Sequence, residues 1–377
     1  MSKSYAEKNC VRGDGKDKQD CQSGQILHTA RVSESKTHMP QLDGLRALAM
    51  FGVIYHHWLP AAWRFHFPTE AGLFFFFVLS GYLMTQGLLR EKETHNISTI
   101  LRRFHLKRLV RIYPAYYFAL AIATAFGIRE VWQAPHWWLL NFQNFLILHL
   151  GYWPPGVSHF WTLAVEQQYY LVWPLLILLC PRKLLAPVLL LLTLVSPLTR
   201  FCAAGSGWVS MDLIPWGLLD DFALGSLLAV GKHRGTLLSR RFMDVSGLLA
   251  LAAYGYLYIS WEMQRSVPLW CHTQQTFLAI AFTALIARAS EGRCGPLSQV
   301  FGHRLLVSLG QWSYGIYLFH NLAPFFVGKL FWFLWDPSIP ADLALVLRLP
   351  LFAAVTAALT WACRKWVESP ALRLMNR

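Results

Sequence analysis

Charged residues are scarce in this chain. Asp, Glu, Lys and Arg together make up 14% of the 377 residues, whereas 55% are hydrophobic. This balance excludes an ordinary soluble domain, in which about a quarter of the residues are charged. The mean hydropathy of +0.35 and the recurring apolar runs indicate instead a helical protein that crosses a membrane many times.

The sequence also lacks the motifs of several familiar sites. Its seven cysteines are scattered without a Cys-x-x-Cys pair, so neither a metal site nor a disulfide scaffold is predicted. It has no Gly-x-Ser-x-Gly nucleophile motif and no glycine-rich phosphate loop. The net charge of +14 does not predict nucleic-acid binding, because cytoplasmic loops of membrane proteins carry excess Lys and Arg. We therefore predict no metal, no permanently bound cofactor and no nucleic-acid partner.

Ten apolar segments are long enough to span a bilayer as helices. They cover residues 43–61, 71–89, 109–128, 160–180, 184–200, 213–231, 245–261, 268–288, 305–328 and 342–363. The predicted fold is an all-α multi-pass protein of the cell membrane, with one membrane-embedded domain over residues 39–377. Residues 1–38 are polar and lack apolar periodicity, which predicts a disordered cytoplasmic tail.

The distribution of basic residues predicts that both termini are cytoplasmic. In this orientation most of the 34 Lys and Arg residues face the cytoplasm. The exceptions are Arg64, Arg129, Arg200, Arg265, Lys329 and Arg348. Residues 131–150 could form an eleventh span, but that would reverse every later loop. We therefore predict an interfacial or re-entrant segment there, within an outer loop of residues 129–159.

The first apolar segment contains ionisable residues at membrane depth, which is costly and usually marks function. Arg46 and His57 are eleven residues apart, so a helix places them on one face, about 16 Å apart along its axis. His56 points about 80° away from Arg46. Arg46, which could bind a phosphate, and His57, which could act as an acid or a base, are thus predicted on one face of a membrane-spanning helix.

A basic segment precedes the third span. If it is helical, Arg103, Lys107 and Arg111 form a stripe, with Arg108 beside Arg111. Guanidinium groups suit phosphate oxygens, so a cytoplasmic cosubstrate that carries phosphates would fit here. On composition alone, contact with anionic lipid headgroups is the favoured alternative.

Other ionisable side chains are predicted at a depth similar to that of His57. They are Glu166 in the fourth span, Asp220 in the sixth and His320 in the ninth. A carboxylate that orients a histidine commonly creates a general base near neutral pH, so Glu166 is the best candidate partner for His57. Each residue taken singly could equally be a satisfied structural polar group.

Six sequence blocks, in this order, resemble the integral-membrane acyltransferase family usually called acyltransferase family three. The blocks are Leu42–Ala49 with His57 at the family's arginine-to-histidine spacing, Phe75–Gly81, Arg108–Pro114, Phe160–Tyr170, Ser313–His320 and Val367–Pro370. The resemblance implies a fold of about ten spans and O-acylation, most often O-acetylation, of a glycan or lipid-linked saccharide such as O-antigen or exopolysaccharide. It also implies acyl-CoA as the cytoplasmic donor.

The resemblance and the residue patterns together give a predicted site. Its residues are His57 and Glu166 for catalysis, Arg46, Lys107, Arg108 and Arg111 for the donor, and Asp43, Trp161, Asp220, Tyr314 and His320 for support. Acceptor contacts are expected from the loop of residues 129–159, which includes His136 and His159.

The sequence leaves alternatives open. His57 could act as a general base for direct transfer, or it could carry the acyl group itself. The chain could be a transporter that uses the intramembrane residues as a proton relay. It could also be another type of membrane acyltransferase in which His320 is the indispensable histidine.

Overall fold

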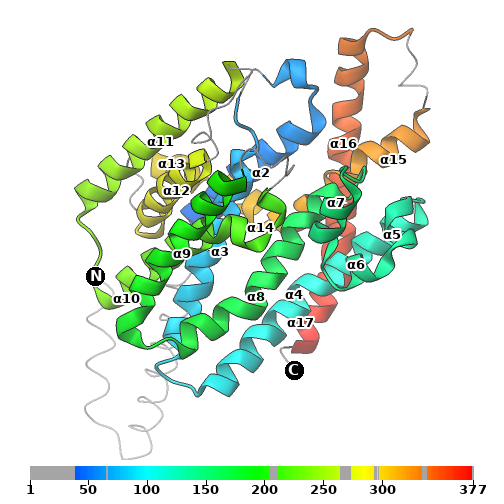
Figure 1. Cartoon of the computed structure of the whole chain (residues 1–377). Coiled ribbons are helices and arrows are strands. Elements are labelled where there is room, and N and C mark those ends of the chain that lie inside the picture. Colours follow the sequence, from blue (N-terminus) through cyan, green and yellow to red (C-terminus); the bar gives the residue numbers. More distant parts are fainter. Residues whose placement is uncertain are drawn as a thin grey trace, which may run out of the picture. The chain divides into compact units, whose positions relative to one another are not determined.

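A computed structural model describes residues 39–64, 67–203, 211–263, 273–292, 295, 297–332 and 338–375, and within them every regular element is helical (Figure 1). The predicted all-α class is confirmed. The predicted tail and Arg265 lie outside the described residues. The helices of at least 16 residues are α2 (Pro40–Trp58), α3 (Ala71–Glu91), α4 (Ile97–Ala125), α8 (Trp161–Leu179), α9 (Arg182–Ala203), α10 (Leu219–Arg234), α11 (Arg240–Met263), α12 (Gln274–Ser290), α14 (Arg304–Phe319) and α16 (Ala341–Cys363).

The shorter elements connect these helices or end the chain. They are α5 (Arg129–Gln133), α6 (Pro135–Leu139), α7 (Gln143–Leu150), α13 (Leu297–Phe301), α15 (Leu322–Leu330), α17 (Ser369–Met375), four 3₁₀ turns at Ala61–Trp63, Ser158–Phe160, Met211–Leu213 and Pro215–Leu218, and the π-helical turn η7 (Arg364–Glu368).

Within the described ranges, four helices are long and apolar enough by themselves to cross a membrane. They are α3, α9, α11 and the continuous stretch Ala341–Met375, which runs through α16, η7 and α17. Several other predicted spans carry charged side chains, as α2 does with Asp43 and Arg46. The number of ten spans and the placement of the termini therefore stay predictions.

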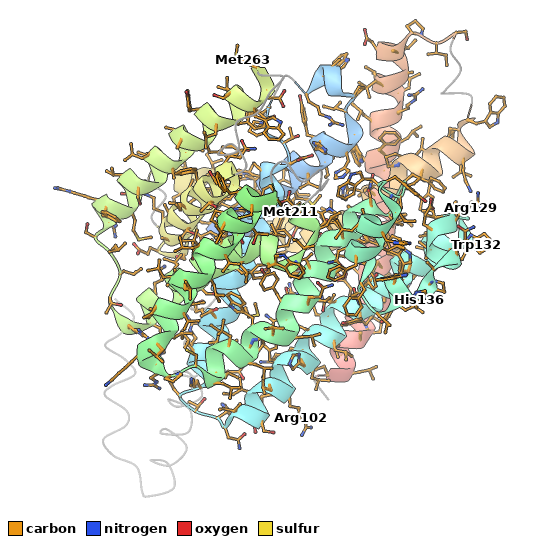
Figure 2. The ribbon with its side chains drawn as sticks, in the orientation of Figure 1. Arg102, Arg129, Trp132, His136, Met211 and Met263 are labelled. Atoms are coloured by element: carbon orange, nitrogen blue, oxygen red, sulfur yellow. The ribbon has the colours of Figure 1, made fainter. Side chains whose placement is uncertain are left out.

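Residues 131–150 do not form one spanning helix. They belong to three short helices, α5 to α7, each far below the roughly 20 residues that a bilayer requires. The buried Trp138 indole donates to the Glu130 carbonyl at 2.8 Å and ties α6 back to α5. Figure 2 shows Arg129, Trp132 and His136 together beyond the C-terminal end of α4, whereas Arg102 lies near its start. A continuous eleventh spanning helix is excluded in this segment.

The basic segment before the third predicted span is helical. Helix α4 begins at Ile97, where the Asn96 side chain accepts a hydrogen bond from the Thr99 N–H at 2.9 Å and caps the first turn. It continues without interruption to Ala125. The predicted stripe of Arg103, Lys107 and Arg111 therefore lies on one continuous helix.

The ninth predicted span, residues 305–328, is broken in the structure. Helix α14 ends at Phe319 and α15 begins at Leu322, with His320 and Asn321 between them. His320 is fully buried at this break, and Asn321 is half-buried. The break places His320 at a helix end, where its backbone N–H still donates to Ile316 at 2.9 Å.

The sixth predicted span, residues 213–231, begins later than the sequence suggested. Pro215 starts a 3₁₀ turn, and the α-helix α10 begins only at Leu219. Asp220 is therefore in the first turn of α10, not several residues inside a spanning helix.

Glycines allow helices to approach closely, as the small residues of membrane helices commonly do. A Cβ atom on Gly81 of α3 would lie 2.3 Å from the carbonyl oxygen of Phe222, and one on Gly225 of α10 would lie 2.0 Å from that of Val78. Gly81 and Gly225 therefore mark a site of close helix packing. Helices α3 and α10 pack along each other through these two contacts.

Helices α2 and α14 run in the same direction. Near their N-terminal ends, a Cβ atom on Gly310 would lie 1.8 Å from the Asp43 carbonyl oxygen, so the two backbones touch there. At their C-terminal ends, the rings of His57 and His320 have centroids 4.9 Å apart. In the predicted order, α2 and α14 belong to the first and ninth spans. Odd-numbered spans cross the membrane in the same direction, so the shared direction agrees with that order.

Candidate active site

Three histidines meet at the C-terminal end of α2. His57 comes from α2, His159 from the turn before α8, and His320 from the break between α14 and α15. The His320 ring centroid lies 4.9 Å from that of His57 and 4.7 Å from that of His159. His159 and His320 are buried, whereas His57 is only half-buried. We call these three residues the histidine cluster, and His57 is its most accessible member.

The hydrogen bonds of the cluster assign the protons of His57 and His320. A carbonyl oxygen can only accept, so His57 Nδ1 must donate to the Val53 carbonyl at 2.9 Å, and His320 Nδ1 must donate to the Tyr317 carbonyl at 2.7 Å. His320 Nε2 is then an acceptor, and it lies 3.3 Å from His57 Nδ1. The remaining ring nitrogen of His57, Nε2, carries a lone pair and can accept a proton.

The third histidine is fixed in the opposite tautomer. His159 Nε2 donates to the Leu318 carbonyl at 3.2 Å, and its Nδ1 accepts from the Asn321 amide at 3.3 Å. The Trp58 indole donates to the His320 carbonyl at 2.8 Å and so ties the end of α2 to the helix break. The hydrogen-bond partners of all three rings are thus neutral groups. Such partners suit a neutral His57 that can accept a proton.

The His56 ring lies 5.3 Å from that of His57, but the hydrogen bonds of His56 go to the turn before α3. Its Nε2 donates to the Glu70 carboxylate at 2.9 Å, and its Nδ1 lies 3.0 Å from the Thr69 hydroxyl. This hydrogen bond from His56 holds the pKa of Glu70, which precedes α3, below its ordinary value. His56 therefore fixes the turn between α2 and α3.

Glu166 does not supply the carboxylate partner that the sequence predicted for His57. Glu166 accepts a short hydrogen bond from Ser80 of α3, and it interacts electrostatically with Arg46 and Arg108. The reason is its position along α8. His159, not Glu166, lies at the end of α8 that meets His57, and seven residues of helix carry Glu166 about 10 Å further.

The other end of α2 meets a group of arginines. Arg46 donates to Asp43 at 3.5 Å and interacts electrostatically with Arg111 and Glu166. Arg108 lies over the ring of Phe104, with its guanidinium carbon 3.6 Å from the ring centroid. We call Arg46, Arg108 and Arg111 the arginine cluster. It concentrates positive charge beside Glu166, roughly one length of α2 away from the histidine cluster.

The comparison with known proteins decides the family. A family model described as an acyltransferase domain matches residues 39–365, which is most of the chain.

The chain belongs to acyltransferase family three.

Two relatives are similar to it over most of its length. The peptidoglycan O-acetyltransferase OatA of Listeria monocytogenes is 28% identical over 314 residues, which cover 76% of this chain and 49% of that protein. The O-acetyltransferase OatA of Staphylococcus aureus is 25% identical over 330 residues, which cover 79% of this chain and 52% of that protein. The chain thus spans about half the length of these relatives. No solved structure shows a significant match.

Family membership and the apolar helices identify a multi-pass membrane protein. Within it, the remaining predicted site residues fall in three places. Asp43 and Tyr314 lie near the arginine cluster, where the Tyr314 hydroxyl donates to the Ile112 carbonyl at 2.9 Å. Lys107 pairs with Glu91 at 3.3 Å on the surface. Trp161 packs in the core against Phe77.

Asp220 lies in neither cluster. Its carboxylate pairs with Arg200 of α9 in a short, buried contact and accepts from the Thr276 hydroxyl at 2.6 Å. Arg200 also donates to the Gly217 carbonyl at 2.8 Å and to the Gln275 side chain at 2.9 Å. These contacts join α9, α10 and α12, as expected of a structural ion pair.

No sequence pattern predicted the partnership between His57 and His159. His159 was expected to contact the acceptor, because it lies in the loop of residues 129–159. The bond from Ser80 to Glu166 was not predicted either. Both contacts join residues that are more than 80 positions apart in the chain. No local pattern encodes such pairs.

Proposed function

We propose that this chain transfers an acetyl group from acetyl-CoA at the cytoplasmic face to a hydroxyl of an extracytoplasmic glycan, with peptidoglycan as the first acceptor to test. One observation carries the proposal: Arg46 of α2 joins an arginine cluster with Arg108 and Arg111 of α4, and the C-terminal end of α2 carries a proton-accepting histidine. The names of the relatives support acetyl as the group and peptidoglycan as the acceptor.

The proposed reaction is a direct transfer. The acceptor hydroxyl gives its proton to His57 Nε2 while its oxygen attacks the carbonyl carbon of the thioester. The carbon–sulfur bond then breaks, and the thiolate of CoA takes the proton back from the imidazolium. The products are the O-acetyl ester and free CoA, and His57 returns to its starting tautomer. The arginine cluster binds phosphates of the donor.

The transporter alternative lacks a supporting observation. The same buried ionisable groups that suggested a proton relay are paired within the two clusters or in the Arg200–Asp220 ion pair. The family to which the chain belongs is one of acyltransferases.

The function is tested with the purified chain, acetyl-CoA labelled in its acetyl group, and peptidoglycan fragments. We expect label to appear in the fragments as an ester that mild base releases as acetate. Label that stays bound to the protein when no acceptor is present would replace direct transfer by an acyl-histidine step. A chain that transfers no label to any glycan and releases no CoA would contradict the proposal.

His320 is predicted to be a positioning residue for His57. In His320→Leu the His57 N–H loses an acceptor, so we expect kcat to fall about tenfold, in line with one neutral hydrogen bond, with the KM for acetyl-CoA unchanged. His320→Gln keeps an acceptor oxygen and should recover part of the rate. A loss as large as that of a His57 variant would instead make His320 the catalytic histidine.

A further inference from the structure

A cavity of about 230 Å³ lies beside α4, next to the arginine cluster. Its walls come from α4, α14, α16, η7 and α17, and they include Arg111, Trp312, Tyr314, Thr360, Arg364 and Glu368. Figure 1 shows α17 beside the first half of α4, and these two elements are in contact. Arg111 belongs both to the arginine cluster and to this cavity, so the cavity adjoins the proposed donor site.

The backbone beside the cavity is unusual. Residues 364–368 form a π-helical turn between α16 and α17, and such turns are rare and frequently occur at functional sites. Both Arg364 and Glu368, the first and last residues of the turn, line the cavity. The turn therefore shapes one wall and supplies two charged groups to it.

The Glu368 carboxylate of the cavity interacts electrostatically with Arg364 and Arg111, and it is not close enough to either for an ion pair. Among the described residues, the structure gives the guanidinium groups of Arg111 and Arg364 no hydrogen bond or ion pair within 4 Å. The Thr360 hydroxyl is buried and has no partner in the same part of the chain. The guanidinium carbon of Arg364 lies 4.6 Å from the centre of the Trp312 ring. Two guanidinium groups and an aromatic ring suit a ligand with a phosphate and a planar base.

We propose that this cavity binds the base and phosphorylated ribose of the CoA donor, with Arg364 and Arg111 on the ribose phosphate and Trp312 against the base. This inference rests on the proposed function. The cavity is smaller than the roughly 300–1,000 Å³ of sites that enclose a drug-sized ligand, so it takes one end of the donor. Arg46 of α2 and Arg108 of α4 do not line the cavity, and they are left for the diphosphate that leads towards His57.

The test compares CoA with dephospho-CoA, which lacks only the phosphate on the ribose. Binding of both to the purified chain is measured by calorimetry in wild type, in Arg364→Gln and in Lys365→Gln. Lys365 is the matched control, because it carries the same charge one residue away but faces the Trp361 and Trp366 rings and does not line the cavity.

We expect Arg364→Gln to weaken CoA binding roughly ten- to a hundredfold and to leave dephospho-CoA binding unchanged, because a charge-assisted hydrogen bond to that phosphate is lost. Lys365→Gln should bind both as the wild type does. Equal weakening of both ligands, or no change in either, would overturn the inference. No change would also point to the phosphate of a lipid headgroup as the ligand of Arg364.

These outcomes separate the inference from the proposed function. Suppose that the wild type binds CoA and transfers acetyl, and that Arg364→Gln still prefers CoA over dephospho-CoA. This result contradicts the inference alone. A wild type that binds neither ligand contradicts both. Arg364→Lys is the second variant if Arg364→Gln does not fold, and it should retain part of the preference because it keeps the charge without the planar fork.

Discussion

Replacing His57 by alanine is expected to lower the rate of acetyl transfer by about 10²- to 10⁴-fold, the usual contribution of a positioned general base. The structure supplies the reason. His57 Nδ1 is committed to the Val53 carbonyl and His320, so Nε2 is the atom that can take the acceptor proton. The rate is measured as release of the CoA thiol with peptidoglycan fragments, at equal amounts of folded protein.

His56→Ala is the matched control for this variant. It removes the same side chain from the same helix end. The His56 ring contacts the edge of His57, but its two ring nitrogens bond to Glu70 and Thr69. We expect the transfer rate of His56→Ala to stay within a few fold of the wild type. If the two alanine variants lose activity equally, damage to the end of α2 explains both, and His57 is not the base.

The second large effect concerns stability. Asp220→Asn leaves the buried Arg200 guanidinium without its carboxylate, and breaking a buried ion pair from one side typically costs about 3–5 kcal/mol. We expect this variant to lose its fold at a much lower temperature than the wild type. The measurement is the temperature at which the detergent-solubilised protein ceases to run as a single monodisperse peak.

Asp221→Asn, at the neighbouring position, is the control for the stability effect of Asp220→Asn. Asp221 is equally buried, but its Oδ1 atom has no hydrogen-bond partner within the described ranges, and one arginine faces two aspartates. Removing this second negative charge is expected to leave the unfolding temperature unchanged or to raise it. If Asp221→Asn is as damaging as Asp220→Asn, the ion pair with Arg200 does not explain the stability of this region.

Regular helical geometry explains what could be predicted from the sequence. The positions of Arg46 and His57 follow from one helix and its fixed rise, so counting residues was sufficient to place them at its two ends. The helical character of the segment that carries Lys107 and Arg111 followed in the same way. These features depend only on local sequence.

Relations between helices could not be counted in this way. Glu166 was paired with His57 because both were counted from the predicted outer ends of their spans, but α8 starts with the buried turn that carries His159. Pro324 cannot donate a backbone hydrogen bond to the His320 carbonyl, which fits the helix break there, and Pro215 delayed the start of α10. The sequence does not show which side chains these two breaks bring together. Tertiary contacts decide these cases, and a single sequence does not contain them in readable form.

The central claim is that the chain carries an acetyl group from a donor on one face of the membrane to a glycan on the other through His57. The most direct test uses sealed inverted membrane vesicles that enclose peptidoglycan fragments, with labelled acetyl-CoA supplied only outside, at the cytoplasmic face. We predict label on the enclosed fragments with the wild type and only background label with His57→Ala. Label that appears only on fragments added to the donor side, or equally with both proteins, would contradict the account.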